Sequence, residues 1–388
     1  MAVVKGLPKD DEAVAKHRKA SQSLRAIKAM VTLAQSLPAL QVTPSVTGED
    51  PYSLATPSGV VNLRNGEVTP PDPAGAFHSR STSVPYDTNM ETPRWNTFIS
   101  QICGGDEDLI CYLQCLVGYS ATGVTDSHIL PFLHGPGGNG KSVLMDVITT
   151  LLGDYATSAP TKFLLAGSGQ HDTEIARLAG QRMVVCSEVN PNQKFDEAKL
   201  KLLTGGDLLT ARFMYRDYFT WKPTHHLWLM GNHQPRVAAG GESFWRRLRV
   251  IPFPYTVPAD KRIPGLDAIL IEEEGPGILA WIVAGAQMVL KGGLIEPSVV
   301  TIATDTYAEE EDSLARFLED RVVREEGVRT PTADLVHDFK RWCQEEHEPD
   351  MTLQMFGREV RQRFGIKQEK SNGYRYYVGI RLRYPPPF

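Results

Sequence analysis

The spacing of apolar residues changes several times along the chain. Over residues 11–37 and 93–123, apolar side chains recur three or four positions apart, which predicts amphipathic helices. Between residues 125 and 255, short apolar runs alternate with helical stretches. That is the pattern of an α/β protein whose mostly parallel sheet is covered by helices on both faces. Residues 264–294 return to helical spacing and stop at two glycines.

The last eighty residues predict a separate small module. After a possible linker over residues 295–312, the pattern predicts three helices and then two strands joined by a turn at residues 371–373, which is the order of a winged helix-turn-helix. The predicted helices span residues 314–323, 332–346 and 352–364, and the strand-turn-strand spans 366–383. The predicted domains are a mainly helical N-terminal region over residues 1–122, an α/β domain over 123–300 and the winged helix over 308–383.

A phosphate-binding loop lies at the start of the α/β region. Its eight residues are Gly135, Pro136, Gly137, Gly138, Asn139, Gly140, Lys141 and Ser142. Glycines let backbone N–H groups converge on phosphate oxygens, and the helix that follows adds the positive end of its dipole. An apolar run precedes the loop and a helical pattern follows it, as the mechanism requires. The loop predicts binding of ATP, with Lys141 at the β and γ phosphates and the Ser142 hydroxyl on Mg²⁺.

Two polar residues follow later apolar strands. Glu188 comes after the strand predicted at residues 183–186, and Asn232 after the strand at residues 227–230. Ligands of α/β sheets bind at the carboxyl ends of the strands. We therefore expect Glu188 to hold the magnesium water shell and polarise the attacking water, and Asn232 to sense the γ-phosphate. A solvated glutamate and an asparagine that only favours a turn are the alternatives.

An arginine cluster precedes the last predicted strand of the sheet. Arg246, Arg247 and Arg249 stand in the run Phe-Trp-Arg-Arg-Leu-Arg. An arginine supplied by a neighbouring subunit can accelerate phosphoryl transfer by about 10³ to 10⁵. The same three residues could instead form a solvated strand edge.

Composition and charge exclude some classes of protein. The chain is 41% hydrophobic and 22% charged, as soluble globular proteins are, and no run approaches the ~20 apolar residues of a membrane span. The five cysteines lack the spacing of a zinc site. We expect no membrane association and a location in the cytoplasm.

The net charge of −5 hides a basic tail. Its cations are candidates for DNA contact on the third helix and the wing of the predicted module, although such modules also bind proteins. The candidates are Arg358, Arg361, Arg363, Lys367, Lys370 and Arg375.

Taken together, these motifs resemble the superfamily 3 helicases, and most closely the helicase part of phage and plasmid primase-helicases. The similarity runs from about residue 50 to about residue 383. It includes the phosphate loop, Ser187-Glu188, the stretches at residues 201–207 and 231–235, and Phe244–Arg247. It implies an AAA+ core that assembles into a ring, usually a hexamer, hydrolyses ATP between subunits and moves along DNA.

The resemblance also implies roles for single residues. Arg247 would be the arginine finger, with Arg246 and Arg249 as substitutes, and Lys201 would lie near the neighbour's nucleotide. Residues 212–221 would form a hairpin in the ring channel, where Tyr215 and Arg216 grip single-stranded DNA.

The sequence departs from the family in two places. Many members have two adjacent acids where this chain has Ser187-Glu188, and longer members carry a primase domain for which residues 1–50 are too short. We expect no priming activity in this polypeptide, so a separate primase or initiation protein is a possible partner.

The predicted function is that of an ATP-dependent DNA helicase of a phage, plasmid or related mobile element, acting on single-stranded DNA and on forked or origin duplex DNA. The alternative is an initiator or clamp that uses ATP to assemble on an origin without processive unwinding. A P-loop kinase of small molecules would need neither the arginine cluster nor the basic tail.

Overall fold

The computed structural model describes residues 12–37, 50–70, 78–160, 162–167, 172–187, 193–237, 241–348 and 351–384. Residues 1–48 form one compact unit and residues 49–388 another. The first unit contains helices α2 (Glu12–Ser21) and α3 (Leu24–Ser36). A single helix over residues 11–37 is therefore wrong. The reason is Ser23, whose hydroxyl accepts a hydrogen bond from the Ala26 N–H at 3.2 Å and starts a new helix.

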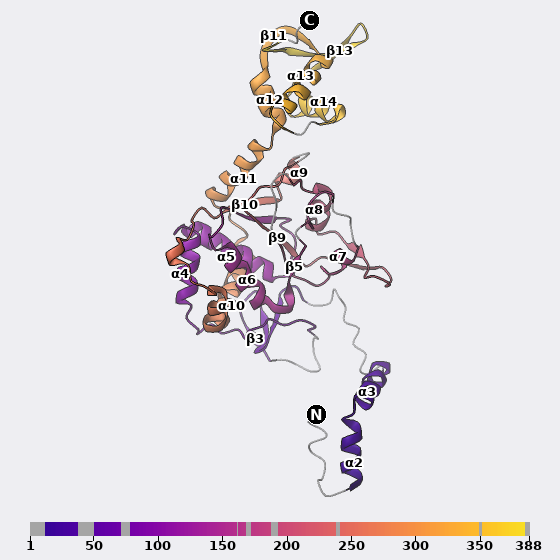
Figure 1. Cartoon of the computed structure of the whole chain (residues 1–388), viewed down its shortest axis with the longest axis vertical. Coiled ribbons are helices and arrows are strands. Elements are labelled where there is room, and N and C mark those ends of the chain that lie inside the picture. Colours follow the sequence, from indigo (N-terminus) through magenta and orange to yellow (C-terminus); the bar gives the residue numbers. More distant parts are fainter. Residues whose placement is uncertain are drawn as a thin grey trace. The chain divides into compact units, whose positions relative to one another are not determined.

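The centre of the second unit is a five-stranded parallel sheet (Figure 1). Its strand order is β10-β4-β9-β6-β5. The strands are β4 (Leu130–His134), β5 (Ala156–Ala159), β6 (Met183–Ser187), β9 (His226–Gly231) and β10 (Leu248–Pro252). The predicted α/β class with a parallel sheet is confirmed.

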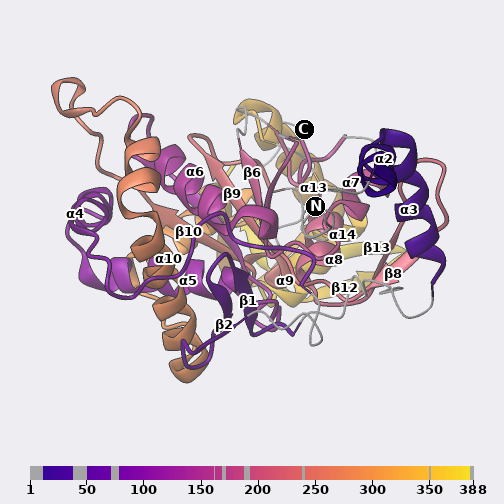
Figure 2. The same ribbon diagram turned by 90° about the horizontal axis from the view of Figure 1, so that it is seen from below.

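Helices cover the two faces of this sheet (Figure 2), because alternate strand residues point to opposite sides. Met183 and Val185 belong to one apolar cluster, while Val184 and Cys186 belong to the other. The first cluster includes α4 (Pro93–Ile102), α5 (Glu107–Ala121), α6 (Lys141–Leu152) and α10 (Leu266–Gly292). The second includes α7 (Asp172–Ala176), α8 (Glu197–Thr204), α9 (Glu242–Trp245) and α11 (Ser298–Glu310).

Helix α11 corrects the linker predicted at residues 295–312. Val300, Thr304 and Tyr307 are its buried residues, at helical spacing. The Thr304 hydroxyl accepts a hydrogen bond from the Val250 N–H at 3.0 Å, so the helix lies along β10.

Two smaller features of the second unit are an antiparallel sheet and a close crossing of two helices. A three-stranded antiparallel sheet consists of β1 (Ser53–Thr56), β2 (Gly59–Asn62) and β3 (Val68–Thr69). Helices α5 and α10 cross in backbone contact, because each has a glycine at the crossing. A Cβ on Gly118 would lie 2.0 Å from the Ala286 nitrogen, and one on Gly285 would lie 2.1 Å from the Gln114 carbonyl oxygen.

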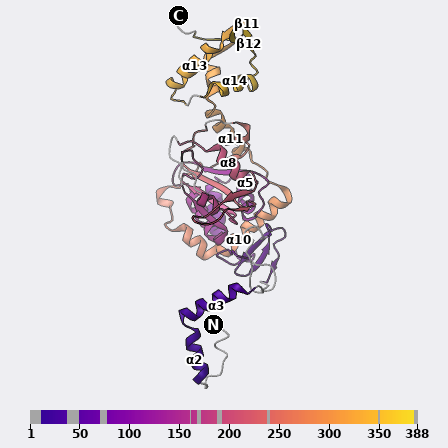
Figure 3. The ribbon, with the colours of Figure 1, turned by 90° about the vertical axis from the view of Figure 1, so that its right-hand side faces the viewer.

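We call residues 313–382, orange to yellow in Figure 3, the C-terminal module. They have an apolar core of their own. The predicted three helices and hairpin are present. The turn Asn372-Gly373 has positive φ at both residues, as a tight hairpin requires. A long strand, β11, was not predicted. The elements are α12 (Ser313–Arg321), β11 (Val322–Pro331), α13 (Thr332–Glu345), α14 (Leu353–Gln362), β12 (Gln368–Ser371) and β13 (Tyr374–Leu382), with antiparallel sheet order β11-β13-β12.

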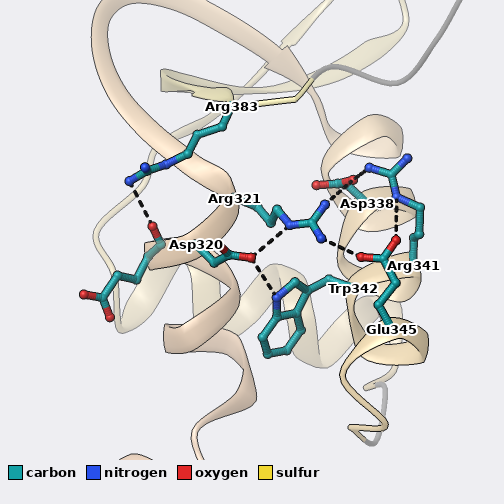
Figure 4. A network of polar contacts seen from close by, with 8 residues as sticks. Asp320, Arg321, Asp338, Arg341, Trp342, Glu345 and Arg383 are labelled. Carbon is teal, nitrogen blue, oxygen red and sulfur yellow. Dashed lines mark hydrogen bonds and ion pairs between the residues drawn. The ribbon is translucent and has the colours of Figure 1, made fainter.

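Polar contacts also join α12 to α13 (Figure 4). Arg321 lies between Asp320, at 3.0 Å, and Glu345, at 2.5 Å. The Trp342 indole N–H donates to Asp320 at 3.1 Å. Arg321 is thus paired inside the module and is not among its cations that face solvent.

Candidate nucleotide-binding site

One cavity of about 510 Å³ lies at the carboxyl end of the parallel sheet. Residues 137–143, from the phosphate loop and the start of α6, line one side, and residues 230–233 at the end of β9 line the other. The two segments meet because β9 pairs directly with β4, with Gly231 opposite His134. The structure therefore brings together the loop and Asn232, whose side-chain nitrogen lies 3.9 Å from the position of a Cβ on Gly137.

The loop depends on glycine at two positions where its backbone is packed closely. Gly140 has φ +86°, and a Cβ there would lie 2.5 Å from the side chain of Ile102 on α4. Gly138 has φ +74°, and its Cβ would lie 2.5 Å from Nη2 of Arg262. A larger residue would disturb the loop at either position.

Lys141 is buried against the loop itself. Its ammonium group donates to the carbonyl oxygens of Gly135, at 2.8 Å, and Pro136, at 3.2 Å, and to Oδ1 of Asn139, at 2.9 Å. Burial lowers the pKa of Lys141 to about 8. These three oxygens hold the ammonium charge of Lys141 at the position where a bound phosphate group would take over as its partner.

Ser142 is placed to act as a metal ligand, because it follows Lys141 at the start of α6. Its hydroxyl is exposed, and its contact is with the sulfur of Met230 at 4.0 Å. In the described part of the chain, no group of three or more acidic, histidine or cysteine side chains could hold a metal by itself. Mg²⁺ commonly binds one or two protein oxygens together with substrate phosphates, so one hydroxyl at this position fits. Glu188 lies outside the described residues.

His134 is a site residue that was not predicted from the sequence. It ends β4, one residue before the loop, and lies near Lys141 and the backbone of Asn232. Burial, and to a lesser extent the charge of Lys141, lower its pKa. His134 is therefore less readily protonated than an ordinary histidine.

Arg262 was also not predicted, since neither spacing nor motif marks it. Its Nε donates to the Val257 carbonyl at 3.0 Å, and the Val257 N–H donates to the Gly138 carbonyl at 2.9 Å. This places its guanidinium group against the phosphate loop.

The arginine cluster lies at the other end of the sheet. Leu248, the first residue of β10, pairs with Leu130, the first residue of β4, while the phosphate loop follows the end of β4. At about 3.3 Å per residue, the strand separates the two ends by roughly 13 Å. None of these arginines is therefore placed at the cavity of its own chain.

The three arginines differ in exposure. Arg247 is only 8% exposed, and its Nε donates to the Thr204 hydroxyl at 3.2 Å. Arg249 pairs with Glu296. Arg246 is exposed, and the described residues offer no side-chain partner for its guanidinium group. Lys201 is half-buried on α8, one turn from Thr204, so it lies on the same side as the cluster.

A hairpin is present at the predicted place, but it begins at Leu209, three residues before the predicted range of 212–221. Its strands β7 (Leu209–Ala211) and β8 (Phe219–Trp221) pair antiparallel. Asp172 anchors its base by accepting a hydrogen bond from Tyr218 at 2.9 Å. At the tip, Tyr215 is 98% exposed with φ +60°, and Arg216 is exposed beside it.

The six basic candidates of the C-terminal module are all exposed. The three from α14 and its end already have partners: Arg358 pairs with Glu359, Arg361 donates to Gln368 and Arg363 pairs with Asp312. Lys370 and Arg375 are cross-strand neighbours in the β12–β13 hairpin. Lys367 lies just before that hairpin.

Comparison with known proteins finds similarity to viral proteins named as putative helicases or primases. Residues 4–104 match the family described as "D5 N terminal like", and residues 133–247 match the "Family of unknown function (DUF5906)". The chain is 26% identical over 318 residues to the "Putative helicase L207/L206" of Acanthamoeba polyphaga mimivirus, covering 76% of this chain and 33% of that protein. It is 23% identical over 326 residues to the "Putative primase C962R" of African swine fever virus, covering 75% and 32%.

These matches confirm the resemblance to a D5-like primase-helicase family, although neither family description names superfamily 3. The chain spans about a third of the length of these two relatives. Among solved structures, the C-terminal region of NrS-1 matches with a TM-score of 0.46 and 13% identity, covering 76% of this chain and 78% of that one. In the described residues, no helix is both long and apolar enough to span a bilayer.

Proposed function

We propose that this chain is an ATP-hydrolysing DNA helicase with an AAA+ type core that works as a ring, in which each nucleotide site depends on an arginine of the neighbouring subunit. The observation that carries the proposal is the shared cavity of the phosphate loop and Asn232 at the carboxyl end of the parallel sheet. Its relatives named as helicases or primases support the same class of activity.

Each residue of the cavity has a distinct proposed role. Lys141 would exchange its loop carbonyl partners for the β and γ phosphates, and the loop amides would bind the phosphate chain. Asn232 would orient the attacking water and sense the γ-phosphate. Ser142 and Glu188 would hold Mg²⁺, which neutralises phosphate charge when bound. Glu188 would also polarise the water.

The ring is proposed from the position of the arginines. Because the cluster lies at the amino end of the strands, an arginine of this chain that acts on a nucleotide must act on a neighbour's. We assign this role to Arg246 rather than to Arg247, since Arg246 is exposed and Arg247 is buried against Thr204. Lys201 would lie at the same interface, and a hexamer is the proposed ring.

DNA contact is proposed at the hairpin and at the C-terminal module. Tyr215 and Arg216 offer a ring for base stacking and a cation for phosphate, and stacking of this kind is worth roughly 1–3 kcal/mol per base. The element order of the C-terminal module supports a winged helix. Its hairpin cations Lys367, Lys370 and Arg375 would contact backbone phosphates.

The test is ATP hydrolysis by the purified chain with and without single-stranded DNA, followed by strand displacement on a forked duplex. The expected result is DNA-stimulated hydrolysis that Lys141→Ala abolishes, together with displacement that requires ATP. The matched control is Lys162→Ala, a lysine outside the cavity. Hydrolysis that survives Lys141→Ala would refute the proposed site. Hydrolysis without displacement would favour an ATP-switched initiator or clamp.

A further inference from the structure

The loop that follows Asn232 is held by backbone contacts from two directions. On one side, the Arg236 N–H donates to the Gln193 carbonyl at 2.7 Å, and the Phe195 N–H donates to the Arg236 carbonyl at 3.0 Å. On the other side, helix α11 holds the loop. The Tyr307 hydroxyl donates to the Pro235 carbonyl, and the Val237 N–H donates to Oε2 of Glu311 at 2.7 Å.

The Arg236 side chain extends this connection to the C-terminal module. Its Nη1 lies 3.1 Å from Oε1 of Glu311, at the end of α11, and 3.5 Å from Oε2 of Glu348, just after α13. The other oxygen of Glu348 lies 2.7 Å from Nη2 of Arg316 on α12. Glu348 therefore binds one arginine from the core and one from the module.

The two carboxylates are well shielded from solvent. The side chain of Glu311 is 9% exposed and that of Glu348 is 7% exposed. Removing one member of such a shielded group leaves the others uncompensated, so the arrangement tends to be kept or lost as a unit. Arg236 is only four residues from Asn232, which leaves little chain between the ion pairs and the cavity.

We propose that Arg236 is a positioning residue that couples the nucleotide cavity to the C-terminal module through Glu311 and Glu348. Movement of the Asn232 loop on nucleotide binding would alter the contact that Arg236 makes with Glu348, and so the hold on the module. This coupling rests on the proposed nucleotide site, but it requires neither hydrolysis nor unwinding. Because coupling between sites is reciprocal, a ligand of the module would change nucleotide affinity by the same factor.

The experiment is amide hydrogen exchange on the full chain, with and without the nonhydrolysable analogue AMP-PNP. In the wild type, we expect the analogue to change exchange in α12 by at least about fivefold, the lower end of ordinary coupling between sites. Glu348→Gln keeps the side-chain shape and removes the charge, so it should abolish this difference while the dissociation constant for AMP-PNP stays within about twofold. The matched control is Glu369→Gln, which breaks the exposed pair with Arg329 in the same module and should leave the difference intact.

A second measurement separates positioning from simple structural support. Arg236→Gln should lower kcat for ATP with little change in KM, and Arg236→Lys, which keeps the charge but replaces the planar guanidinium group, should recover part of kcat. A nucleotide-dependent difference in α12 that persists in Glu348→Gln would overturn the proposal, as would a wild type that binds AMP-PNP without any such difference. Failure of AMP-PNP to bind at all, or of Lys141→Ala to abolish binding, would instead refute the proposed nucleotide site.

Discussion

Lys141 carries the charge that the cavity needs, and its protonation should control nucleotide affinity. Because the pKa of Lys141 is lowered to about 8, its side chain in the nucleotide-free site keeps its proton below pH 8 and loses it above. Binding to phosphate requires the proton, so affinity for ADP should be flat below pH 8. Above pH 8 it should fall by up to about tenfold per pH unit, since one pH unit corresponds to about 1.36 kcal/mol. Titration calorimetry between pH 6.5 and 9.5 measures this.

Stability provides the control for that prediction. The ordinary pKa of lysine is 10.5, so between pH 8 and 10.5 the unfolded chain holds a proton at Lys141 that the folded chain has lost. The contribution of Lys141 to the free energy of unfolding therefore rises with pH over this range, opposite to the trend in affinity. In Lys141→Arg, the guanidinium group stays charged and the slope of affinity above pH 8 should vanish. A wild-type affinity that is flat to pH 9.5 would contradict the argument.

Loss of the Arg246 side chain should lower the ATPase rate, whereas loss of the Arg247 side chain should lower the free energy of unfolding. Arg246→Ala removes an exposed side chain and should change the free energy of unfolding by less than about 0.5 kcal/mol. Its ATPase rate should fall by about 10³ if it acts on the neighbour's nucleotide. Arg247→Leu removes the donor to Thr204 and should cost about 1–3 kcal/mol of stability. Urea unfolding and ATPase assays give both values.

If Arg246→Ala instead lost stability and Arg247→Leu lost ATPase activity, the trans-acting role would belong to Arg247.

The sequence could predict the cluster but not which arginine is exposed, because adjacent positions differ only in how the folded elements cover them. The same limit applies to Arg262, which reaches Gly138 through a loop with no recognisable spacing.

At the scale of elements, the crossing of α5 and α10 should be the most sensitive contact between helices in the core. A Cβ on Gly118 would lie 2.0 Å from the backbone nitrogen of Ala286, so the helices must separate to admit it. Gly118→Ala should destabilise the fold by about 1–3 kcal/mol or more. Thermal or urea unfolding measures the loss.

Gly292 is the matched control on the same helix, because a Cβ there would meet nothing within 4 Å. Gly292→Ala should leave stability unchanged or raise it by up to about 1 kcal/mol, since alanine favours helix over glycine. Equal effects of the two substitutions would show that the crossing tolerates separation.

How well each element could be predicted follows from how it is buried. Strands β4, β6, β9 and β10 and helix α6 were predicted because their apolar residues are mostly buried. Strand β5 was not predicted, because it has no buried residue and half of it is polar. Strand β11 was missed because half of its residues are exposed and only two are buried, so it carries no apolar alternation. Helix α11 was missed because two of its three buried residues are Thr304 and Tyr307, which a hydrophobic pattern counts weakly.

At the scale of the whole molecule, the positions of the charged residues say more about a candidate DNA surface than the net charge does. The net charge is −5, yet the exposed cations Lys370 and Arg375 lie together on the β12–β13 hairpin, and Lys367 lies just before it. The basic tail in the sequence indicates this candidate DNA surface, which the average charge conceals, and DNA binding there is still a prediction. Pairing within the module could not be predicted from sequence, and it leaves α14 with fewer unpaired cations than the count of arginines suggests.

A ring with shared sites can be tested by mixing two inactive variants. Lys141→Ala lacks a working phosphate loop and Arg246→Ala lacks the arginine supplied to the neighbour, so each alone should be inactive. In rings assembled at random from equal amounts, about a quarter of the interfaces would join an intact loop to an intact Arg246, as a head-to-tail interface requires. If the interfaces act independently, the mixture should recover about a quarter of the wild-type ATPase rate. Mixing Lys141→Ala with the double variant should recover none, and a mixed ring without recovery would refute the shared site.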